Sequence, residues 1–410
     1  FTSDGIRIQS GGDDITIAGN WIGTTGTGSI GVGNGDDGVE LRGARTSVGG
    51  TDASDRNVIT GSGDEGIDIV GSGVTAHVIR GNYIGVDPDG SSGNGNGDVG
   101  IAIISGSGNT IGGTSSAARN IISRNFEGIE INTANNVVQG NYIGTDATGI
   151  QNRGNRSDDG IEIQNGGSGN TIGGTSSEAG NLIAFNARDG VNLVSGSGNS
   201  VLGNSIHSNT NLGVDLAPNG VSANDGVKTA GAANLLMDHP VFTVATLSGT
   251  TLTVAGYVGS APGQALFANA RVEIFESDND ASGFGEGRTY LAFLTASASG
   301  TFWGTLDVSG MGLAVGDRIT GTATDGSGNT SEFGANAEVT VATAVELLSF
   351  VARARDSAVL LEWETASETK NLGFHVYRSL SAEGPWERIT ASLIPGLGSS
   401  PEGARYAYRD

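Results

Sequence analysis

The chain has 410 residues, of which 71 are glycine and none is cysteine, so neither disulfide bonds nor thiolate metal sites can stabilise it. Its 44 acidic residues outnumber 21 lysines and arginines, for a net charge of −23. This balance argues against electrostatic binding to nucleic acid or to an anionic membrane, and it favours divalent cations, or neutral or cationic polymers, as partners. No apolar run is long enough to span a membrane.

The first half of the chain repeats itself. The ten residues GNWIGTTGTG (19–28) return as GNYIGVDPDG (81–90) and GNYIGTDATG (140–149). A shorter motif, glycine followed by an apolar, a variable and an apolar residue, occurs eight times: GIRI (5–8), GVEL (38–41), GIDI (66–69), GIAI (100–103), GIEI (128–131), GIEI (160–163), GVNL (190–193) and GVDL (213–216). Alternation over so few positions, bounded by Gly and Asn, indicates short β-strands.

Two further motifs recur in step with the first. One reads TSVGG (46–50), NTIGG (109–113 and 170–174) and NSVLGN (199–204), and the other is Asn, variable, Ile, running from Asn20 to Ile206 in seven copies. Each unit therefore holds three strands but cannot bury its apolar face alone, so successive units must stack in parallel register. Residues 1–228 are predicted to form a right-handed β-solenoid of about eight coils.

These repeats carry a resemblance to a known superfamily. Residues 1 to about 225 resemble the right-handed parallel β-helix repeats of the pectin-lyase-like superfamily, in the version common in large bacterial extracellular proteins. The resemblance implies a parallel β-helix at a bacterial surface or outside the cell. It does not choose among lyases, hydrolases, adhesins and inert stalks.

The rhythm of Gly and Asn stops near residue 229. Segments such as TLTVAGYV (251–258) and ARVEIFES (270–277) alternate with a period of two, which predicts an antiparallel sandwich over 229–343. It resembles bacterial immunoglobulin-like domains.

A third block spans 344–410. AVLLEWETASETKNLGFHVYRS (358–379) resembles two strands of a fibronectin type III domain, with Trp363 and Tyr377 at core positions. Two strands of such a domain would be missing, and an open sheet edge could pair with another chain. The chain also begins without Met or a signal peptide, so we expect it to be part of a longer protein. The fold class is therefore all-β: a right-handed parallel β-helix, an immunoglobulin-like β-sandwich and a partial fibronectin type III-like β-sandwich.

The variable residue of the eightfold motif should point outward and form a row. Its members are Arg7, Glu40, Asp68, Ala102, Glu130, Glu162, Asn192 and Asp215, with further acidic residues at the corner before each strand. Because like charges repel when they lie opposite in a sheet, Glu127, Glu130, Asp159 and Glu162 are predicted to bind calcium. The alternative is a solvated acidic face with splayed side chains.

The same row suggests an enzymatic alternative. Glu130 and Glu162 would lie about 5 Å apart, as in a retaining glycosidase, although any two stacked acids have this spacing. A lyase would need a nearby Arg, Lys or His as base, yet His77 and His207 lie away from the row. We therefore expect a protein that is not an enzyme, with a polysaccharide lyase or hydrolase as the alternative.

Two other features could bind ligands. Trp21, Tyr83 and Tyr142 recur on alternate coils and could stack sugar rings, unless the loops that follow fold back as lids. The loop SDNDASGFGEG (277–287) places Asp278, Asp280 and Glu286 in a loose likeness of a calcium loop, although plain acidic turns look similar.

Together these patterns predict an extracellular or surface-exposed bacterial structural and binding protein. Its expected ligands are calcium and polysaccharide, and self-association through open sheet edges into a filament or layer is a further hypothesis.

Overall fold

The computed structural model describes residues 2–25, 33–278, 280–341, 345–355, 358–381, 384–400 and 402–410. The described chain is all-β apart from four short 3₁₀ helices: η1 (Ala53–Asp55), η2 (Ser116–Ala118), η3 (Ala233–Leu236) and η4 (Ala265–Phe267). It divides into two compact units, residues 1–243 with 256–302 and 317–338, and residues 244–255 with 303–316 and 339–410. None of the described helices has the length and apolarity that crossing a bilayer would require.

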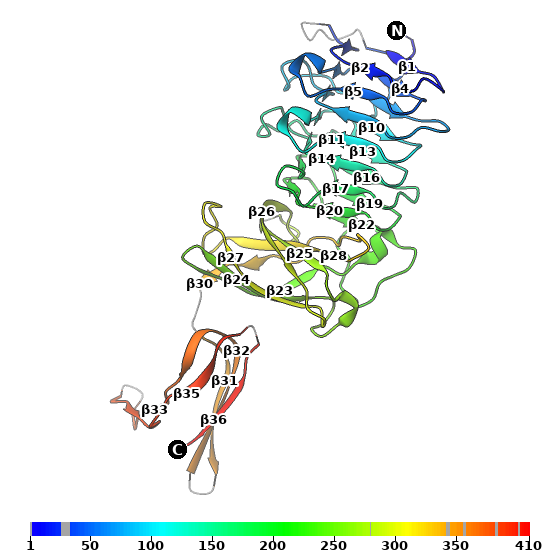
Figure 1. The fold of residues 1–410 in the computed structure, drawn as a ribbon. Helices are drawn as coiled ribbons and strands as arrows, with labels where there is room; N and C mark the ends of the chain where they lie inside the picture. Colours follow the sequence, from blue (N-terminus) through cyan, green and yellow to red (C-terminus); the bar gives the residue numbers. More distant parts are fainter. Residues whose placement is uncertain are drawn as a thin grey trace. The chain divides into compact units, whose positions relative to one another are not determined.

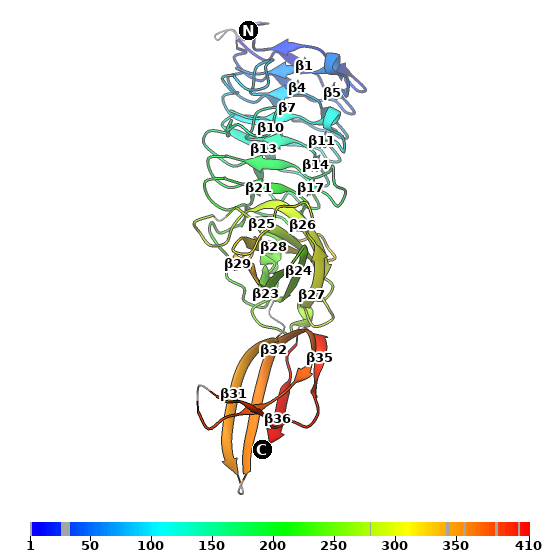
Figure 2. The ribbon, with the colours of Figure 1, turned by 90° about the vertical axis from the view of Figure 1, so that its left-hand side faces the viewer.

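Three parallel sheets build the solenoid, and their strands stack coil upon coil (Figures 1 and 2). The first sheet holds β1 (Ile6–Ile8), β4 (Val39–Leu41), β7 (Ile67–Ile69), β10 (Val99–Ile103), β13 (Glu127–Ile131), β16 (Ile161–Ile163), β19 (Val191–Leu193) and β22 (Val214–Leu216). The second holds β2 (Thr16–Ile17), β5 (Ser47–Gly49), β8 (Val78–Arg80), β11 (Thr110–Gly112), β14 (Val137–Gln139), β17 (Thr171–Gly173) and β20 (Ser200–Leu202). The third holds β3 (Trp21–Ile22), β6 (Val58–Ile59), β9 (Tyr83–Ile84), β12 (Ile121–Ile122), β15 (Tyr142–Ile143), β18 (Leu182–Ala184) and β21 (Ser205–His207). The predicted parallel β-helix is confirmed.

The register places equivalent residues of successive coils directly over one another. Ile101 pairs with Ile67 on one side and with Ile129 on the other, and all three are fully buried in one continuous core. The Asn motif gives a second apolar column, in which Ile122 lies between Ile84 and Ile143. A third column runs through the second sheet, and its members Ile17, Ile79 and Val138 belong to strands that the sequence motifs did not reveal.

Stacked asparagines line the corner before the third sheet. Asn141 shows the pattern of this first ladder: its Oδ1 accepts the backbone N–H and the side-chain amide of Asn120, at 3.3 and 2.9 Å. Its own Nδ2 donates to Asn181 Oδ1 and to the carbonyl of Ile111, both at 3.0 Å. The ladder comprises Asn20, Asn57, Asn82, Asn120, Asn141, Asn181 and Asn204. Every donor and acceptor of the Asn141 side chain is thus satisfied inside the protein.

Two more ladders stand at other corners, and the sequence analysis did not identify them. The second runs through Asn96, Asn125, Asn155, Asn186 and Asn209. The third runs through Asn109, Asn136, Asn170 and Asn199 and meets His77 at one end, where His77 accepts the N–H of Thr46 through Nδ1. Asn109, Asn170 and Asn199 of the third ladder begin the recurring NTIGG and NSVLGN motifs, which the sequence analysis interpreted only as strands. The asparagines of the second ladder have different neighbours in each coil.

The last coil ends against side chains from later in the chain, all within the first unit. Glu286 accepts the backbone N–H and the side-chain amide of Asn209, at 3.0 and 2.7 Å. Glu273 accepts the N–H of Gly203, and Glu332 accepts that of Leu216. All three carboxylates are at most 2% exposed. They satisfy strand-edge N–H groups that would otherwise be orphaned in an apolar setting.

Two four-stranded sheets in a β-sandwich arrangement follow the solenoid, with antiparallel pairing throughout the first and one parallel pair, in which Thr246 lies opposite Thr340, in the second. One sheet has the order β26 (Gly287–Thr295), β25 (Arg271–Ser277), β28 (Arg318–Thr324) and β29 (Ala337–Glu338). Another has the order β27 (Thr301–Asp307), β24 (Thr251–Val258), β23 (Pro240–Ser248) and β30 (Thr340–Val341). A core around Phe267, Val272 and Phe302 forms in the first unit, where alternating apolar residues predicted it.

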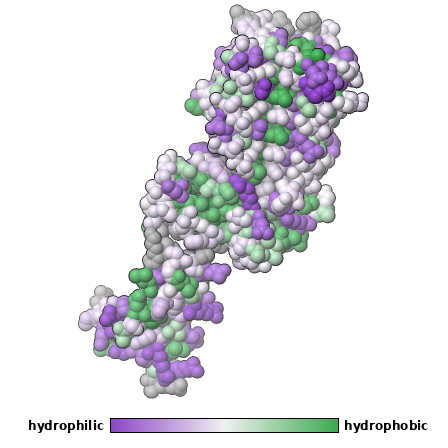
Figure 3. Space-filling model, viewed as in Figure 1, coloured by the Kyte–Doolittle hydropathy of each residue, from purple (hydrophilic) through white to green (hydrophobic). Residues whose placement is uncertain are grey.

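The C-terminal strands form a four-stranded sheet and a hairpin. β32 (Ala358–Phe374) pairs with β31 (Val345–Arg355), β35 (Ile394–Ser400) and β36 (Arg405–Arg409), and β33 (Tyr377–Arg378) pairs with β34 (Glu387–Arg388). Trp363 is buried and stacks on Tyr406, with ring centroids 5.5 Å apart. The core position predicted for Tyr377 is wrong, because the hairpin carries this residue away from Trp363 and leaves it 50% exposed. Hydrophobic residues are visible on the surface of this region in Figure 3.

Candidate functional site

The outward row of the first sheet exists as the sequence predicts. Glu130 lies between Ala102 and Glu162 in the parallel register, and the row continues to Asn192 and Asp215. The flanking residues of each strand point into the core, so the row must lie on the outer face. Its environment changes along the solenoid, from crowded carboxylates near the N-terminal end to a mixture of carboxylates and amides further on.

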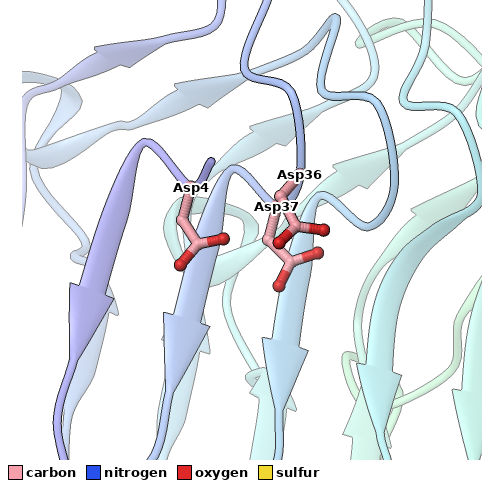
Figure 4. A group of neighbouring side chains, drawn as sticks. All are labelled: Asp4, Asp36 and Asp37. Atoms are coloured by element: carbon pink, nitrogen blue, oxygen red, sulfur yellow. The ribbon is translucent and has the colours of Figure 1, made fainter. Parts of the chain in front are cut away.

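The closest gathering of carboxylates surrounds Asp37. Three groups each bring carboxylate oxygens within 4.8 Å of one another: Asp4, Asp36 and Asp37; Asp37, Glu40 and Asp68; and Asp37, Asp64 and Glu65. Figure 4 shows the first group at the corners that precede β1 and β4. Asp37 belongs to all three, and we call these seven residues the Asp37 cluster. The sequence analysis noted most of these acids but did not select them as the metal site.

Two arginines offset part of this charge. Arg7 forms ion pairs with Asp4 and with Glu40, and Arg42 pairs with Glu40 through both its Nε and its NH2 group. Glu40 is only 2% exposed, and these two guanidinium groups offset the cost of burying its carboxylate. Two cations against seven carboxylates leave a large excess of negative charge in the Asp37 cluster.

This excess shows in the pKa values. Burial, followed by a hydrogen bond with Asp37, raises the pKa of Glu65 to about 9, and burial also raises the pKa of Asp37. Burial and the neighbouring Asp37 and Glu40 raise the pKa of Asp68 to about 7. One oxygen of Asp68, Oδ1, is buried and accepts no hydrogen bond. The cluster therefore holds its negative charge poorly without a further cation.

The four acids predicted to bind calcium lie further along the row. Glu130 Oε1 accepts the amides of Asn132 and Gln164, at 2.6 and 2.8 Å, and Asn192 donates to Asp159 at 2.8 Å. Within the described residues, Glu127, Glu130, Asp159 and Glu162 belong to none of the groups whose carboxylates converge within 4.8 Å. In this part of the row the carboxylates accept hydrogen bonds from side-chain amides, whereas in the Asp37 cluster they pair with arginines.

Burial raises the pKa of three of these acids. It raises the pKa of Glu127 to about 10, with Glu162 and Glu130 adding to the shift. It also raises the pKa of Glu162 to about 7 and that of Asp159 to about 6. Glu127 is 6% exposed, and its Oε1 accepts no hydrogen bond. Glu127 is therefore neutral at pH 7.

The predicted aromatic column is also present, in the order Trp21, Val58, Tyr83, Ile121, Tyr142, Leu182 and Ser205. The guanidinium of Arg119 lies 3.9 Å from the centroid of the Tyr142 ring. A Cβ atom at Gly149 would come within 2.8 Å of the same ring, so the loop after Tyr142 packs closely on it.

Tyr83 has the same surroundings. Arg56 lies 4.1 Å from its ring centroid, and a Cβ atom at Gly90 would come within 3.1 Å of the ring. This arrangement favours the lid hypothesis, because a sugar could stack on either tyrosine only after its loop moved. Trp21 is 51% exposed, and residues 26–32 of the loop that follows it lie outside the described residues.

The acidic loop at 277–287 divides its side chains between two places. Asp278 accepts the N–H of Ser208, and Glu286 accepts two hydrogen bonds from Asn209, so both acids contact the last coil of the solenoid. Asp280 instead caps its own loop by accepting the N–H of Ser282 at 2.7 Å. No group of three converging carboxylates within the described part of the chain includes these residues.

The solenoid histidines have structural surroundings. His77 is fully buried at the end of an asparagine ladder, and burial lowers its pKa. His207 packs edge-on against Phe185, with centroids 5.9 Å apart. No protein-family model matches the chain.

Proposed function

We propose that this chain is a non-enzymatic extracellular structural and binding protein whose solenoid binds calcium at the Asp37 cluster. The observation that carries the proposal is the sharing of Asp37 among three groups of converging carboxylates. Calcium accepts six to eight oxygen ligands and suits such a group. Weak sites of this kind fill at the millimolar calcium concentrations that occur outside cells, which fits the extracellular setting.

The parallel β-helix supports a structural role. Its core is continuous from Ile17 to Leu216, and the asparagine ladders hold adjacent coils together without any cofactor. A stiff scaffold of this kind presents its surface residues at a fixed spacing, which suits repeated weak contacts with a polymer or a neighbouring molecule.

Calorimetry and thermal unfolding with calcium test the proposal. A site with a dissociation constant of about 1 mM would stabilise the protein by about 1.4 kcal/mol in 10 mM calcium. Asp37→Asn should abolish most of this increment, since it removes the shared ligand. Glu178→Gln, which removes one exposed charge elsewhere, should retain it. Absence of both heat and stabilisation in the wild-type protein would end the calcium proposal.

A glycoside hydrolase is the second candidate, and one observation favours it. Glu130 and Glu162 are stacked in register, and the raised pKa of Glu162, about 7, would let it hold a proton, as the acid of a retaining pair requires. A screen over polysaccharides tests this candidate. Turnover that disappears in the Glu130→Gln and Glu162→Gln variants would replace the non-enzymatic proposal.

A further inference from the structure

A pocket opens beside the last coil, at the far end of the acidic row from the Asp37 cluster. It has a volume of about 390 Å³. Three aspartates line it, Asp189, Asp215 and Asp280, together with Leu212, Val221 and Ala281. No lysine, arginine or histidine is among its lining residues. Its charged lining residues are therefore acidic, and they stand beside apolar residues and the neutral polar side chains of Thr210, Asn211, Asn219 and Ser282.

The aspartates come from different parts of the chain. Asp215 is the last member of the outward row on β22, and Asp189 occupies the corner before β19. Asp280 comes from the acidic loop after β25, which lies in the same compact unit. The sequence analysis singled out the row and the loop separately, and the fold brings their ends together.

Asp215 supplies an independent sign that a ligand is missing. The residue is 1% exposed. Its Oδ2 accepts the N–H of Gly220 at 3.2 Å, whereas its Oδ1 is buried and accepts no hydrogen bond. An unpaired buried carboxylate oxygen is costly. Arg188, whose guanidinium pairs with Asp158 at 2.6 Å, donates no hydrogen bond to this oxygen and acts on Asp215 only through its charge.

The spacing of the acids indicates the kind of cation. Among the described residues, the carboxylates that converge closely enough for one metal ion surround Asp37, and none of those groups includes Asp189, Asp215 or Asp280. A single ion could not contact all three aspartates in this arrangement. A longer cation with an apolar stem could reach them while its methylene groups contact Leu212 and Val221.

We infer that this pocket binds an aliphatic ammonium ion, with the charged head at Asp215 and Asp189 and the alkyl stem against Leu212 and Val221. Such a group occurs in free diamines and at the end of a lysine side chain. Asp280, on the outer loop, neutralises a second charge in a diamine or in a lysine-rich peptide. The site is separate from the Asp37 cluster and does not depend on calcium binding there.

Isothermal titration of the full chain tests the inference with three probes: cadaverine, Nα-acetyl-lysine methylamide, and the corresponding norleucine amide as an uncharged control. Both amines should bind, and the norleucine amide should not. Cadaverine binding tighter than the lysine amide would point to free diamines, and the reverse would point to a protein partner. Equal binding of the norleucine amide would overturn the inference.

Substitutions locate the site. Asp215→Asn should weaken amine binding by at least about tenfold, because it removes a charge-assisted hydrogen bond, and Asp280→Asn should weaken cadaverine more than the lysine amide. Asp280 lies on an outer loop, so its variant serves even if Asp215→Asn fails to fold. Glu178→Gln should bind as the wild type does. Unchanged affinity in both pocket variants, or displacement of the amine by millimolar calcium, would refute the ammonium site.

Discussion

The asparagine ladders and the carboxylate row follow the same rule of construction with opposite results. Both place like side chains over one another on successive coils, about 4.8 Å apart. An amide has a donor and an acceptor, so Asn120, Asn141 and Asn181 bond to one another in sequence. A carboxylate offers only acceptors, so Glu130 and Glu162 in the same arrangement repel each other.

The difference shows what a parallel β-helix does to its sequence. Stacking multiplies whatever interaction a side chain has with its own copy, and it stabilises amides while penalising charges. Three acids on this face of the solenoid offset that penalty in different ways. Arginine pairs with Glu40, amides bond to Glu130, and Glu127 keeps its proton.

Breaking a ladder should have the largest effect. Asn141→Ala removes the acceptor of the backbone N–H and the side-chain amide of Asn120, and it takes one side-chain donor each from Asn181 Oδ1 and the Ile111 carbonyl. Because all these groups are buried, we expect a loss of about 3–5 kcal/mol in the free energy of unfolding, measured by urea denaturation. The exposed Asn219→Ala should cost less than about 0.5 kcal/mol. Similar losses for the two variants would contradict the ladder's importance.

Replacing Glu127 by glutamine should stabilise the protein, in contrast to the loss expected for Asn141→Ala. Its pKa is about 10 when folded, against an ordinary value of 4.5. The folded state therefore binds the extra proton, and the contribution of Glu127 to stability falls as pH rises from about 4.5 towards 10. Glu127→Gln keeps the neutral shape, so we expect a gain of about 2 kcal/mol at pH 8 and little gain at pH 5.

Denaturation curves at the two pH values check this prediction. Glu178→Gln is the control, because its exposed side chain should give the same small change at both. A Glu127→Gln variant that is no more stable than the wild type at pH 8 would show that water or a cation reaches this carboxylate.

Much of the solenoid could be predicted from the sequence because its signal is local and repeated. The columns of Ile67 and Ile84 follow from motifs of three or four residues, and stacking then fixes their partners. The strands around Ile17, Ile79 and Val138 were missed because too few of their neighbours recur. The core position predicted for Tyr377 is wrong for another reason, because a single strand-like segment does not reveal where a hairpin will turn.

The site was less predictable because it depends on distances that motifs do not encode. The sequence motifs place the acids of the row on one face of the solenoid. They favoured the stack around Glu130 as the metal site, whereas the closest convergence of carboxylates surrounds Asp37. The difference lies at the corners, where the path of the loop sets how Asp36, Asp37 and Asp64 approach one another. The caps formed by Glu273, Glu286 and Glu332 were equally hidden, since their partners lie 70 to 116 residues away.

Removing an arginine beside Glu40 should show whether calcium can supply the same positive charge. Arg42→Gln leaves Glu40 with Arg7 as its remaining ion-pair partner and should lower the melting temperature measured without calcium. If calcium binds at the Asp37 cluster, 10 mM of it should recover most of this loss, because the ion supplies the missing positive charge. Arg119→Gln, which lies over Tyr142, is the matched control, and calcium should not rescue it. A loss that calcium leaves unchanged would count against the metal site.

The smallest effect should come from Glu130→Gln, which turns one step of the row towards the chemistry of the ladders. Its amide oxygen can still accept from Asn132 and Gln164, and the repulsion of Glu162 disappears. Because Glu130 is half-buried and already bonded to two amides, we expect a gain of only about 0.5 kcal/mol at low salt. The gain should vanish in 1 M sodium chloride, where mobile ions screen the repulsion over about 3 Å. If the gain persisted at high salt, it would come from hydrogen bonding or packing, and the row would owe its instability to burial more than to stacked charge.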